Sequence, residues 1–299
     1  MKAASAAALV AALLLLGGTG SRAQDSGKEL TGTLKHVKET GAITLGYRDS
    51  SIPFSYATGG ADPIGYSMDL CKSIVDDVAI ALGSNIAVKY HMVTSENRIA
   101  AVTDGTVDLE CGSTTANFER KKTVSFSPVF FVAGTKLLVA RASPVHSYRD
   151  LKGKTVVVTA GTTNEAAVKA ISDKQQLGIN FLVGPDHAAS FAMVQSGKAD
   201  AFATDDVLLY GLIATTHTGD KYHVVGDYLS YDPYGLMFRK DDADFAALID
   251  STFTRLAQSR ELVQLYNRWF QQRLPTGESI GLPISPQLEE IFRVQGVPE

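Results

Sequence analysis

The sequence contains little cysteine and, after its N-terminal segment, no long hydrophobic run. Its 299 residues include two cysteines, one tryptophan and six histidines. The histidines are scattered singly, so the spacing typical of a metal centre is missing, and we expect neither a metal nor another cofactor. No segment beyond residue 23 approaches the roughly 20 apolar residues that a membrane-spanning helix needs. We therefore expect a soluble mature protein.

A polybasic tract is also missing. The chain has 28 basic and 32 acidic residues, which gives a net charge of −4. Residues 1–23 contain Lys2 and Arg22 but no acid, so without them 26 basic residues remain against 32 acidic ones, a net charge of −6. A mildly acidic protein of this kind is poorly suited to nucleic acid or to an anionic membrane surface. We expect no nucleic-acid partner.

The N-terminus has the form of a signal peptide. Lys2 provides the charged start, residues 8–16 form the apolar middle, and Ser21-Arg22-Ala23 forms a small-x-small end, which predicts cleavage after Ala23. No cysteine stands directly after the apolar run, where a lipid anchor would be attached. The 276 residues after position 23 favour two domains. The mature protein is therefore expected to be exported.

The two cysteines are Cys71 and Cys111. An exported protein meets an oxidising environment, so a disulfide between them is chemically permitted. One cysteine falls on a predicted helix and the other on a predicted strand of the same αβ unit, and these two elements could pack face to face. We favour the disulfide. A buried pair of free thiols is the alternative, because the Cα separation cannot be read from sequence.

Hydrophobic periodicity divides the chain into two series of strands and helices. The first series starts with a strand at 42–46, and the second begins near Ser143 with a strand at 155–159. Strands that alternate with helices of this length predict parallel sheets with right-handed crossovers. Each series ends its strands in short polar loops. If the carboxyl edges of the two sheets face one another, these loops converge in a cleft that suits a ligand.

Residues 94–131 form the stretch with the clearest binding chemistry. A brief apolar strand is followed by Gly112-Ser113-Thr114-Thr115, and Arg120 comes five residues later. Small residues that expose backbone N–H groups, with a cation nearby, suit a carboxylate. The alternative is an ordinary αβ unit that ends in a polar loop and a solvated basic run.

Segments along nearly the whole mature chain match one family in family order. The chain resembles the periplasmic solute-binding proteins of ABC importers for polar amino acids, and most closely the glutamate/aspartate-binding subfamily. The matching segments are GYRDSSIPFSY (46–56), GYSMDLC (65–71), TSENRI (94–99), DLECGSTTANFERKK (108–122), LKGKTVVVTAGTTNE (151–165), DHAASF (186–191) and TDDVLL (204–209).

This resemblance implies an α/β fold of the two-lobed, type II-like periplasmic binding class. Two parallel-sheet domains are expected, with lobe 1 at 30–139 plus 234–299 and lobe 2 at 140–233. Two chain crossings, near 139 and 233, would form a hinge about which the lobes close on a ligand. The resemblance also implies a periplasmic monomer that binds L-glutamate or L-aspartate and docks transiently on a membrane-embedded ABC permease.

The resemblance assigns nine residues to the ligand. Arg120, Thr115 and Thr163 match positions that hold the α-carboxylate, and Asp205 and Ser113 match positions that hold the α-ammonium group. The residues that match the surroundings of the distal carboxylate are Arg48, Ser95, Arg98 and His187. Two arginines beyond the one on the α-carboxylate are hard to reconcile with a neutral ligand, because a buried guanidinium needs a compensating anion.

Some of these residues have ordinary structural interpretations. Arg120 could be one member of a solvated basic run with two neighbouring lysines, and Asp205 could be a helix cap, although Asp206 suits that role better. His187 could simply start a helix. Glu110 is an unusual charge in an apolar strand, and we expect it to hold an arginine in place from behind. The alternative is that Glu110 points to solvent at the end of the sheet.

Three other functions are open at this point. A periplasmic enzyme, such as a dehydratase, could use the same two-lobed fold, yet no nucleophile stands with a base, and Glu110 and Glu165 have no visible partner as general acids. The protein could bind another polar amino acid, such as glutamine. A sensor could also use such a domain, although no transmembrane helix or signalling domain is present.

Overall fold

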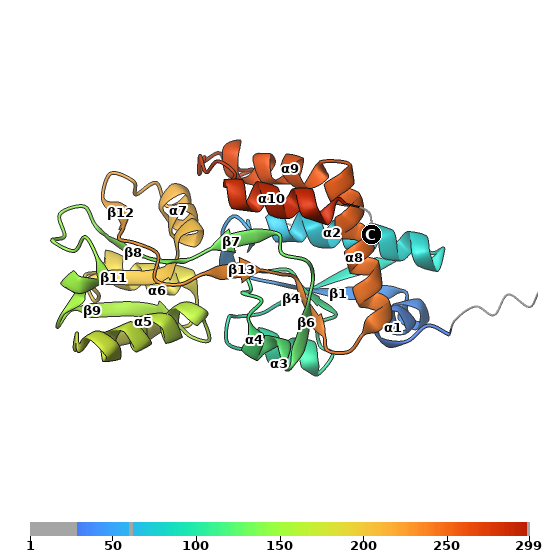
Figure 1. Ribbon diagram of the computed structural model, residues 1–299, viewed down its shortest axis with the longest axis horizontal. Coiled ribbons are helices and arrows are strands. Elements are labelled where there is room, and N and C mark those ends of the chain that lie inside the picture. The colour runs from blue at the N-terminus through green and yellow to red at the C-terminus, as the bar shows by residue number, and fades with distance from the viewer. Residues whose placement is uncertain (1–28, 60–61, 298–299) are drawn as a thin grey trace, which may run out of the picture.

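The structure is a computed structural model that describes residues 29–59 and 62–297. The predicted signal peptide at 1–23 lies outside these residues. Two lobes lie side by side along the longest axis of the molecule, each with a five-stranded sheet (Figure 1). Within the described ranges, no helix has the length and apolar character needed to cross a membrane.

The first sheet has the strand order β4-β1-β5-β14-β6. Strand β1 runs parallel to β4 and β5, whereas β14 is antiparallel to β5 and β6. The strands are β1 (Ala42–Tyr47), β4 (Ala87–Met92), β5 (Leu109–Glu110), β6 (Val124–Phe126) and β14 (Met237–Arg239), with a short hairpin of β2 (Ser50–Ser51) and β3 (Ser55–Tyr56) after β1.

The second sheet has the order β10-β9-β11-β8-β12. Strand β9 is parallel to β10 and β11, while β8 is antiparallel to β11 and β12. The strands are β8 (Thr135–Ala140), β9 (Thr155–Thr159), β10 (Asn180–Gly184), β11 (Ala201–Asp205) and β12 (Tyr222–Val225). Both sheets are therefore mixed rather than purely parallel. Strands β8 and β14 enter their sheets directly from the chain crossings, without a helical crossover, and so run in the reverse direction.

The chain crosses between the lobes along β7 (Phe131–Ala133) and β13 (Asp232–Tyr234), which pair antiparallel. The first crossing had been predicted near residue 139. Because Thr135–Ala140 already bonds to β11 and β12, the crossing lies earlier, at β7. The predicted second crossing near 233 coincides with β13.

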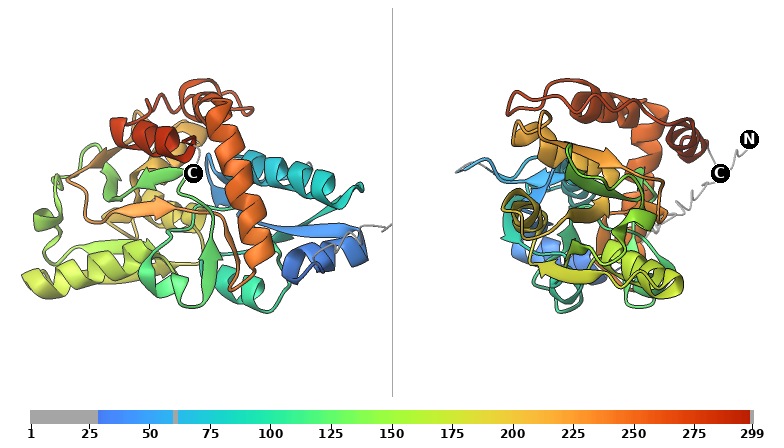
Figure 2. Two further views of the ribbon diagram at one scale, coloured as in Figure 1. Left: turned by 45° about the vertical axis from the view of Figure 1, so that its right-hand side comes forward. Right: turned by 90° about the vertical axis from the view of Figure 1, so that its left-hand side faces the viewer.

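Helices cover the sheets of both lobes. The first lobe carries α1 (Gly32–Thr40), α2 (Tyr66–Leu82), α3 (Arg98–Thr103), α4 (Phe118–Lys121), α8 (Ala243–Gln258), α9 (Glu261–Tyr266), η2 (Asn267–Gln271) and α10 (Pro286–Gln295). The second carries η1 (Tyr148–Leu151), α5 (Thr163–Gln175), α6 (His187–Gln195) and α7 (Asp206–Thr215). The C-terminal helices α8 to α10 thus return to the first lobe (Figures 1 and 2).

Helix α2 illustrates how the sequence dictates these elements. Its apolar residues Leu70, Ile74 and Val78 recur every four positions and are fully buried. The helix ends at Gly83, which adopts a left-handed conformation with φ of 61°. Its buried face belongs to the main core of the first lobe, which extends through an aromatic cluster as far as the crossing strands.

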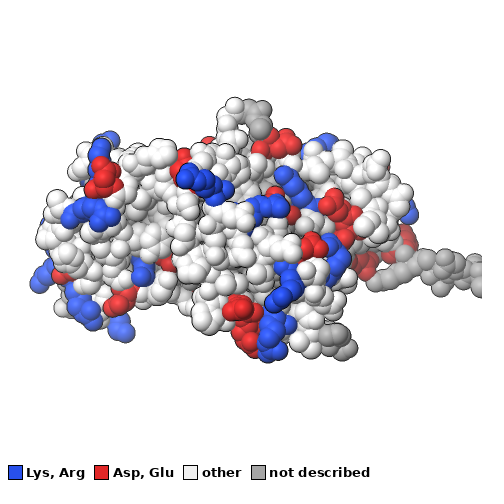
Figure 3. Space-filling view, turned by 90° about the horizontal axis from the view of Figure 1, so that it is seen from above, with Lys and Arg blue, Asp and Glu red and all other residues white. Residues whose placement is uncertain are grey.

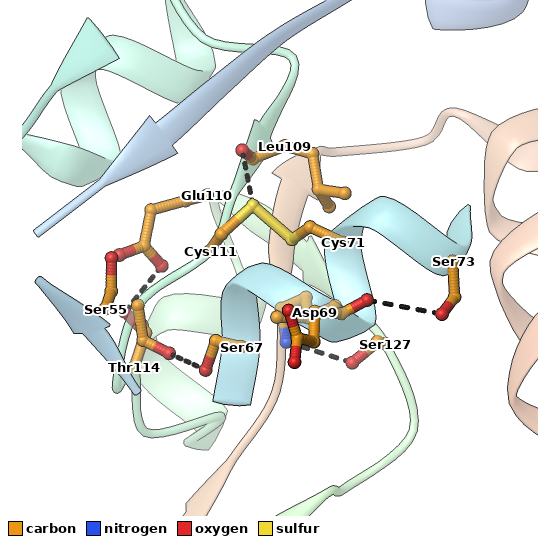
Figure 4. Close-up of a disulfide and its surroundings, with 12 residues drawn as sticks. Ser55, Ser67, Asp69, Cys71, Ser73, Leu109, Glu110, Cys111, Thr114 and Ser127 are labelled. Atoms are coloured by element: carbon orange, nitrogen blue, oxygen red, sulfur yellow. Dashed lines mark hydrogen bonds between the residues drawn. A yellow bond between two sulfur atoms is a disulfide. The ribbon is translucent and has the colours of Figure 1, made fainter. Parts of the chain in front are cut away.

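A disulfide ties α2 to the strand β5 region. Cys71 on α2 and Cys111, the residue after β5, are bonded, with their Cα atoms 6.2 Å apart (Figure 4). Ser67, one turn earlier on α2, also donates a hydrogen bond to the carbonyl oxygen of Gly112 at 2.8 Å. The start of the loop that follows β5 is therefore attached to α2 by a covalent bond and a hydrogen bond.

Candidate ligand-binding site

A small, nearly closed pocket lies between the two lobes. Its lining is polar apart from one leucine, and it consists of Ser95, Arg98, Ser113, Thr115, Thr162, Thr163, Asn164, His187, Asp205 and Leu208. Seven of the nine residues predicted to contact a ligand are in this set. The other two contact residues of this set: Arg48 donates a hydrogen bond to Ser95, and Arg120 donates one to the carbonyl oxygen of Thr115.

The cavity residues come from strand ends and helix starts of both lobes. Arg98 is the first residue of α3, and Ser113 and Thr115 follow β5. From the second lobe, Thr163 and His187 are the first residues of α5 and α6, and Asp205 is the last residue of β11. Since parallel strands bring their carboxyl ends to one edge, the αβ alternation of each lobe gathers these side chains. The cavity is complete only with both lobes.

One end of the cavity is built around two buried arginines. Arg48 and Arg98 are each 2% exposed, and Nη2 of Arg48 donates a hydrogen bond to Ser95. Among the described residues, Nη1 of Arg48 and Nε of Arg98 have no hydrogen-bond partner. Burial, and then the charge of Arg98, lowers the pKa of Arg48 to about 9. Two cations that form no ion pair within the described part of the chain favour an anionic group at this end.

His187 completes this end as a neutral side chain. It is 2% exposed, and its Nδ1 lies 3.1 Å from the hydroxyl of Thr159. Burial, followed by the charges of Arg48 and Arg98, holds the pKa of His187 well below its ordinary value. The start of α6 is capped by Asp186, which accepts a hydrogen bond from the backbone of Ala189 at 2.8 Å. His187 is therefore the first residue of the helix, and it also lines the cavity.

The other end of the cavity is built around Asp205. Its Oδ1 accepts a hydrogen bond from Nδ2 of Asn164 at 2.8 Å, and its Oδ2 accepts one from the hydroxyl of Tyr234. Asp205 makes no capping hydrogen bond to α7, so the capping interpretation does not describe its side chain. Burial, and then the nearby carboxylate of Asp232, raises the pKa of Asp205 to about 7. An ammonium group here would favour the ionised form.

Asn164 and Tyr234 were not predicted. Asn164 directly follows Thr163 in the first turn of α5, and its position beside a predicted ligand residue was an available signal. Tyr234 lies on the crossing strand β13, and no sequence pattern connects it with Asp205, 29 residues earlier.

Arg120 spans the boundary between the lobes. Its Nη1 donates to the carbonyl oxygen of Thr115 at 3.0 Å, and its Nη2 donates to that of Gly161 at 3.2 Å. The neighbouring Lys122 instead pairs with Glu119 at the surface, at 2.8 Å. Arg120 thus differs from a solvated basic run. Burial, and then the charge of Arg98, lowers its pKa to about 9.

Glu110 is fully buried, so it does not point to solvent. Its Oε2 accepts a hydrogen bond from Thr114 at 2.7 Å (Figure 4), and its Oε1 has no hydrogen-bond partner among the described residues. Among the described residues, no ion pair within 4.0 Å joins Glu110 to a cation. Its negative charge nevertheless raises the pKa of Arg48 and Arg98, against the larger effect of their burial.

The cavity wall combines charged side chains of both signs with hydroxyl groups. Within residues 29–59 and 62–297, no three side chains of His, Cys, Asp or Glu gather as a metal site would require. The cavity instead combines cations at one end, a carboxylate at the other, and hydroxyl groups between them. This pattern suits an organic ion that carries charges of both signs.

Residues 43–272 match the family described as bacterial extracellular solute-binding proteins, family 3. The chain belongs to this family. It is 46% identical over 267 residues to the L-glutamate/L-aspartate-binding protein of Pseudomonas aeruginosa, with 88% of each chain covered. It is 36% identical over 289 residues to the glutamate/aspartate import solute-binding protein of Escherichia coli, with 96% and 95% covered.

Solved structures show the same two-lobed fold. A mutant of the protein ArgBP from T. maritima superposes with a TM-score of 0.71 at 26% identity, which covers 80% of this chain and 99% of that one. The predicted fold class and the resemblance to amino-acid-binding proteins are therefore confirmed.

Proposed function

We propose that this protein binds an acidic amino acid, L-glutamate or L-aspartate, between its lobes and delivers it to an ABC importer. The observation that carries the proposal is the pair of buried arginines, Arg48 and Arg98, whose guanidinium groups keep N–H atoms that have no partner among residues 29–59 and 62–297. A side-chain carboxylate of the ligand would take these donors. The names of the relatives from P. aeruginosa and E. coli support the same ligand class.

The rest of the cavity suits the head group of an amino acid. Asp205 and the hydroxyl of Ser113, which has no hydrogen-bond partner within the described part of the chain, would accept from the α-ammonium group. The N–H of Thr163 stands at the start of α5, where helix geometry leaves it without an intrahelical partner, and would donate to the α-carboxylate. Arg120 and the backbone N–H of Thr115, whose carbonyl oxygen accepts from Arg120, would complete the carboxylate seat.

Glutamine is the alternative that this charge pattern disfavours. An amide brings no negative charge to Arg48 and Arg98, so their burial would remain uncompensated. Calorimetric titration with L-glutamate, L-aspartate, L-glutamine and the D-forms tests this directly. We expect the two acidic L-amino acids to bind most tightly. Equal affinity for L-glutamine and L-glutamate would refute the roles given to the two arginines.

The variant Arg98→Ala tests the role of one of these arginines directly. Loss of a charge-assisted contact should weaken L-glutamate binding about tenfold to a hundredfold. The exposed Arg149→Ala serves as the matched control and should bind like the wild type. Thermal unfolding checks that Arg98→Ala is folded. Wild-type affinity in a folded Arg98→Ala protein would contradict the proposed site.

The proposal assigns no catalytic residue. Glu165, one candidate general acid, pairs with Lys169 at 2.7 Å on the same helix and accepts a hydrogen bond from the backbone of Gly161 at 3.2 Å. Glu110, the other candidate, is held by Thr114. A turnover assay with keto and hydroxy acids should yield no product, and product formation would favour the dehydratase-like alternative.

Location and partner complete the proposal. We infer export to the periplasm with cleavage after Ala23, and transient docking of a monomer on a membrane-embedded permease. Basic and acidic side chains are interspersed on the face shown in Figure 3, which suits a protein free in solution. Mass spectrometry of the exported protein should find Gln24 at the new N-terminus, and an uncleaved chain would contradict the inferred processing.

A further inference from the structure

Asp232 lies at the crossing between the lobes and outside the set of predicted ligand residues. It is the first residue of β13, whose antiparallel pairing with β7 carries the chain from one sheet to the other (Figure 1). Its side chain is buried, with the residue 2% exposed. A buried carboxylate at a hinge must be stabilised by donors, and those donors show what it contacts.

The carboxylate of Asp232 accepts hydrogen bonds from three side chains. Its Oδ1 accepts from the hydroxyl of Thr115 at 3.0 Å and from that of Thr163 at 2.7 Å, and its Oδ2 accepts from Ser230. Thr115 follows β5 of the first sheet, whereas Thr163 starts α5 on the second. One carboxylate on the crossing strand therefore holds a cavity residue from each lobe.

This arrangement fixes what the two threonines offer to the cavity. A hydroxyl group has one proton to donate and lone pairs that accept. Because Thr115 and Thr163 both donate to Asp232, their oxygen atoms keep only acceptor capacity, and these oxygens lie 3.2 Å apart in the cavity wall. Two acceptors side by side favour a cationic donor such as an ammonium group.

A chain of hydrogen bonds links Asp232 with Asp205. Ser230 lies 2.7 Å from the hydroxyl of Thr135, which accepts from Nδ2 of Asn164 at 2.7 Å, and the same Nδ2 donates to Asp205 at 2.8 Å. The two carboxylates therefore terminate one buried network that runs through the crossing.

We propose that Asp232 is a positioning residue of the binding site, which orients the hydroxyls of Thr115 and Thr163 as acceptors for the ligand's α-ammonium group and connects that group to the hinge. This inference rests on the proposed function in one respect, namely that the ligand is an α-amino acid. Asp232 acts on the ligand through the two threonines, which separates it from the residues that line the cavity.

The test compares two ligands that differ only in the ammonium group. L-glutamate carries it, and glutarate keeps both carboxylates without it. The variant Asp232→Asn should weaken L-glutamate binding about tenfold or more, whereas glutarate binding, measured by competition, should change less than about threefold. Asp227→Asn is the matched control, since Asp227 is exposed on the segment just before β13, and it should bind both ligands like the wild type.

A second variant keeps the test decisive if Asp232→Asn folds poorly. Thr163→Val removes one of the two hydroxyls without altering Asp232, and it should weaken L-glutamate binding in the same selective way. In the double variant, Asp232→Asn should cost less than it does in the wild-type background, because the part of its effect that passes through Thr163 is already lost and only the part through Thr115 remains. Thermal unfolding of each variant checks that the chain is folded.

Three results would overturn the inference. Unchanged L-glutamate affinity in Asp232→Asn, an equal loss for L-glutamate and glutarate, or full additivity with Thr163→Val would each leave Asp232 without a positioning role. The proposed function is judged separately, by wild-type titration. If the wild type bound L-glutamine instead of an acidic amino acid, the proposed specificity would fail, and the same variants would test Asp232 with L-glutamine.

Discussion

Tyr234 donates its phenolic hydrogen to Asp205, and this bond joins the crossing strand β13 to the end of β11 in the second lobe. The tyrosine ring is fully buried among the aromatic side chains of the first lobe, with Phe54 at 5.1 Å and Phe131 at 5.8 Å between ring centroids. The carboxylate of Asp205 is thus anchored to the core of the opposite lobe. A hydrogen bond to the ionised form favours ionisation and lowers the carboxyl pKa.

The variant Tyr234→Phe should therefore weaken ligand binding at neutral pH. Without the phenolic donor, the pKa of Asp205 should rise above its present value of about 7, so a smaller fraction of the protein has the carboxylate that an ammonium group needs. We expect a several-fold loss of L-glutamate affinity at pH 7 that narrows at pH 9, measured by calorimetry across this range.

Tyr228→Phe is the control for this prediction. The hydroxyl of Tyr228 donates to Asp206 at 2.7 Å, so the same atom is removed beside a carboxylate that does not line the cavity. This variant should bind L-glutamate with the affinity of the wild type. Equal losses in both variants, or a loss in Tyr234→Phe that does not depend on pH, would count against the role of Tyr234.

The raised pKa of Asp205 also predicts how the stability of the ligand-free protein depends on pH. The folded pKa is about 7, against an ordinary value of 3.8, and burial is the first cause. The folded state therefore binds the proton more tightly than the unfolded state. Its contribution to stability is fully present below pH 4 and is lost as the pH rises to 7, by up to about 4 kcal/mol.

Urea unfolding of the wild type and of Asp205→Asn at pH 5 and pH 8 tests this linkage. The difference between the two proteins isolates Asp205 from His187, whose lowered pKa acts in the opposite sense by removing stability as the pH falls below 6.5. We expect Asp205→Asn to gain stability relative to the wild type between pH 5 and pH 8. A difference that stays constant across this range would rule out the linkage.

The sequence predicted the residues that lie at regular places in the αβ units, because the carboxyl ends of parallel strands must meet at one edge. Ser113, Thr163, His187 and Asp205 all stand at such places. The crossing strand β13 follows no such rule. Asp232 reaches Thr115 across 117 positions of sequence, and only the folded hinge brings the two together.

The direction of the strands next to the crossings could not be predicted either, because the crossings do not follow the regular αβ pattern. Strands β8 and β14 carry apolar residues like their parallel neighbours, so their pattern does not reveal that they run antiparallel. For Glu110 the sequence left both contact with an arginine and exposure to solvent open, because one acid in a short apolar strand is compatible with either face of the sheet, and the structure shows it buried. The role of Glu110 depends on the arginines around it.

The variant Glu110→Gln tests whether this carboxylate compensates the charge of the buried arginines. The carboxylate raises the pKa of Arg48 and Arg98, so its neutralisation leaves the two buried cations with less compensation. We expect the ligand-free protein to lose about 1–3 kcal/mol of unfolding free energy, the range for an uncompensated buried polar group. L-glutamate binding should change as well, because the positions of the arginines depend on this charge.

Denaturant unfolding and calorimetry of Glu110→Gln, with the exposed Glu119→Gln beside it as a control, provide the measurement. Glu119 contacts Lys122 at the surface, and its neutralisation should have little effect on stability. Unchanged stability and unchanged L-glutamate affinity in Glu110→Gln would rule out a supporting role for this residue.

The disulfide between Cys71 and Cys111 should contribute mainly to stability rather than to ligand contacts. It closes a loop of 40 residues, which corresponds to about 4 kcal/mol in the chain-entropy description of the unfolded state. Cys111 stands two residues before Ser113, but the hydrogen bond from Ser67 to Gly112 still holds the segment between them to α2 when the disulfide is absent. The double variant Cys71→Ala, Cys111→Ala should therefore unfold at a much lower denaturant concentration while losing less than about tenfold in L-glutamate affinity.

Reduction of the wild type should lower its midpoint of denaturant unfolding to a similar extent, and the same reductant should leave the double variant unchanged. A midpoint that resists reduction, with the thiols shown to be free by labelling, would contradict the stabilising role.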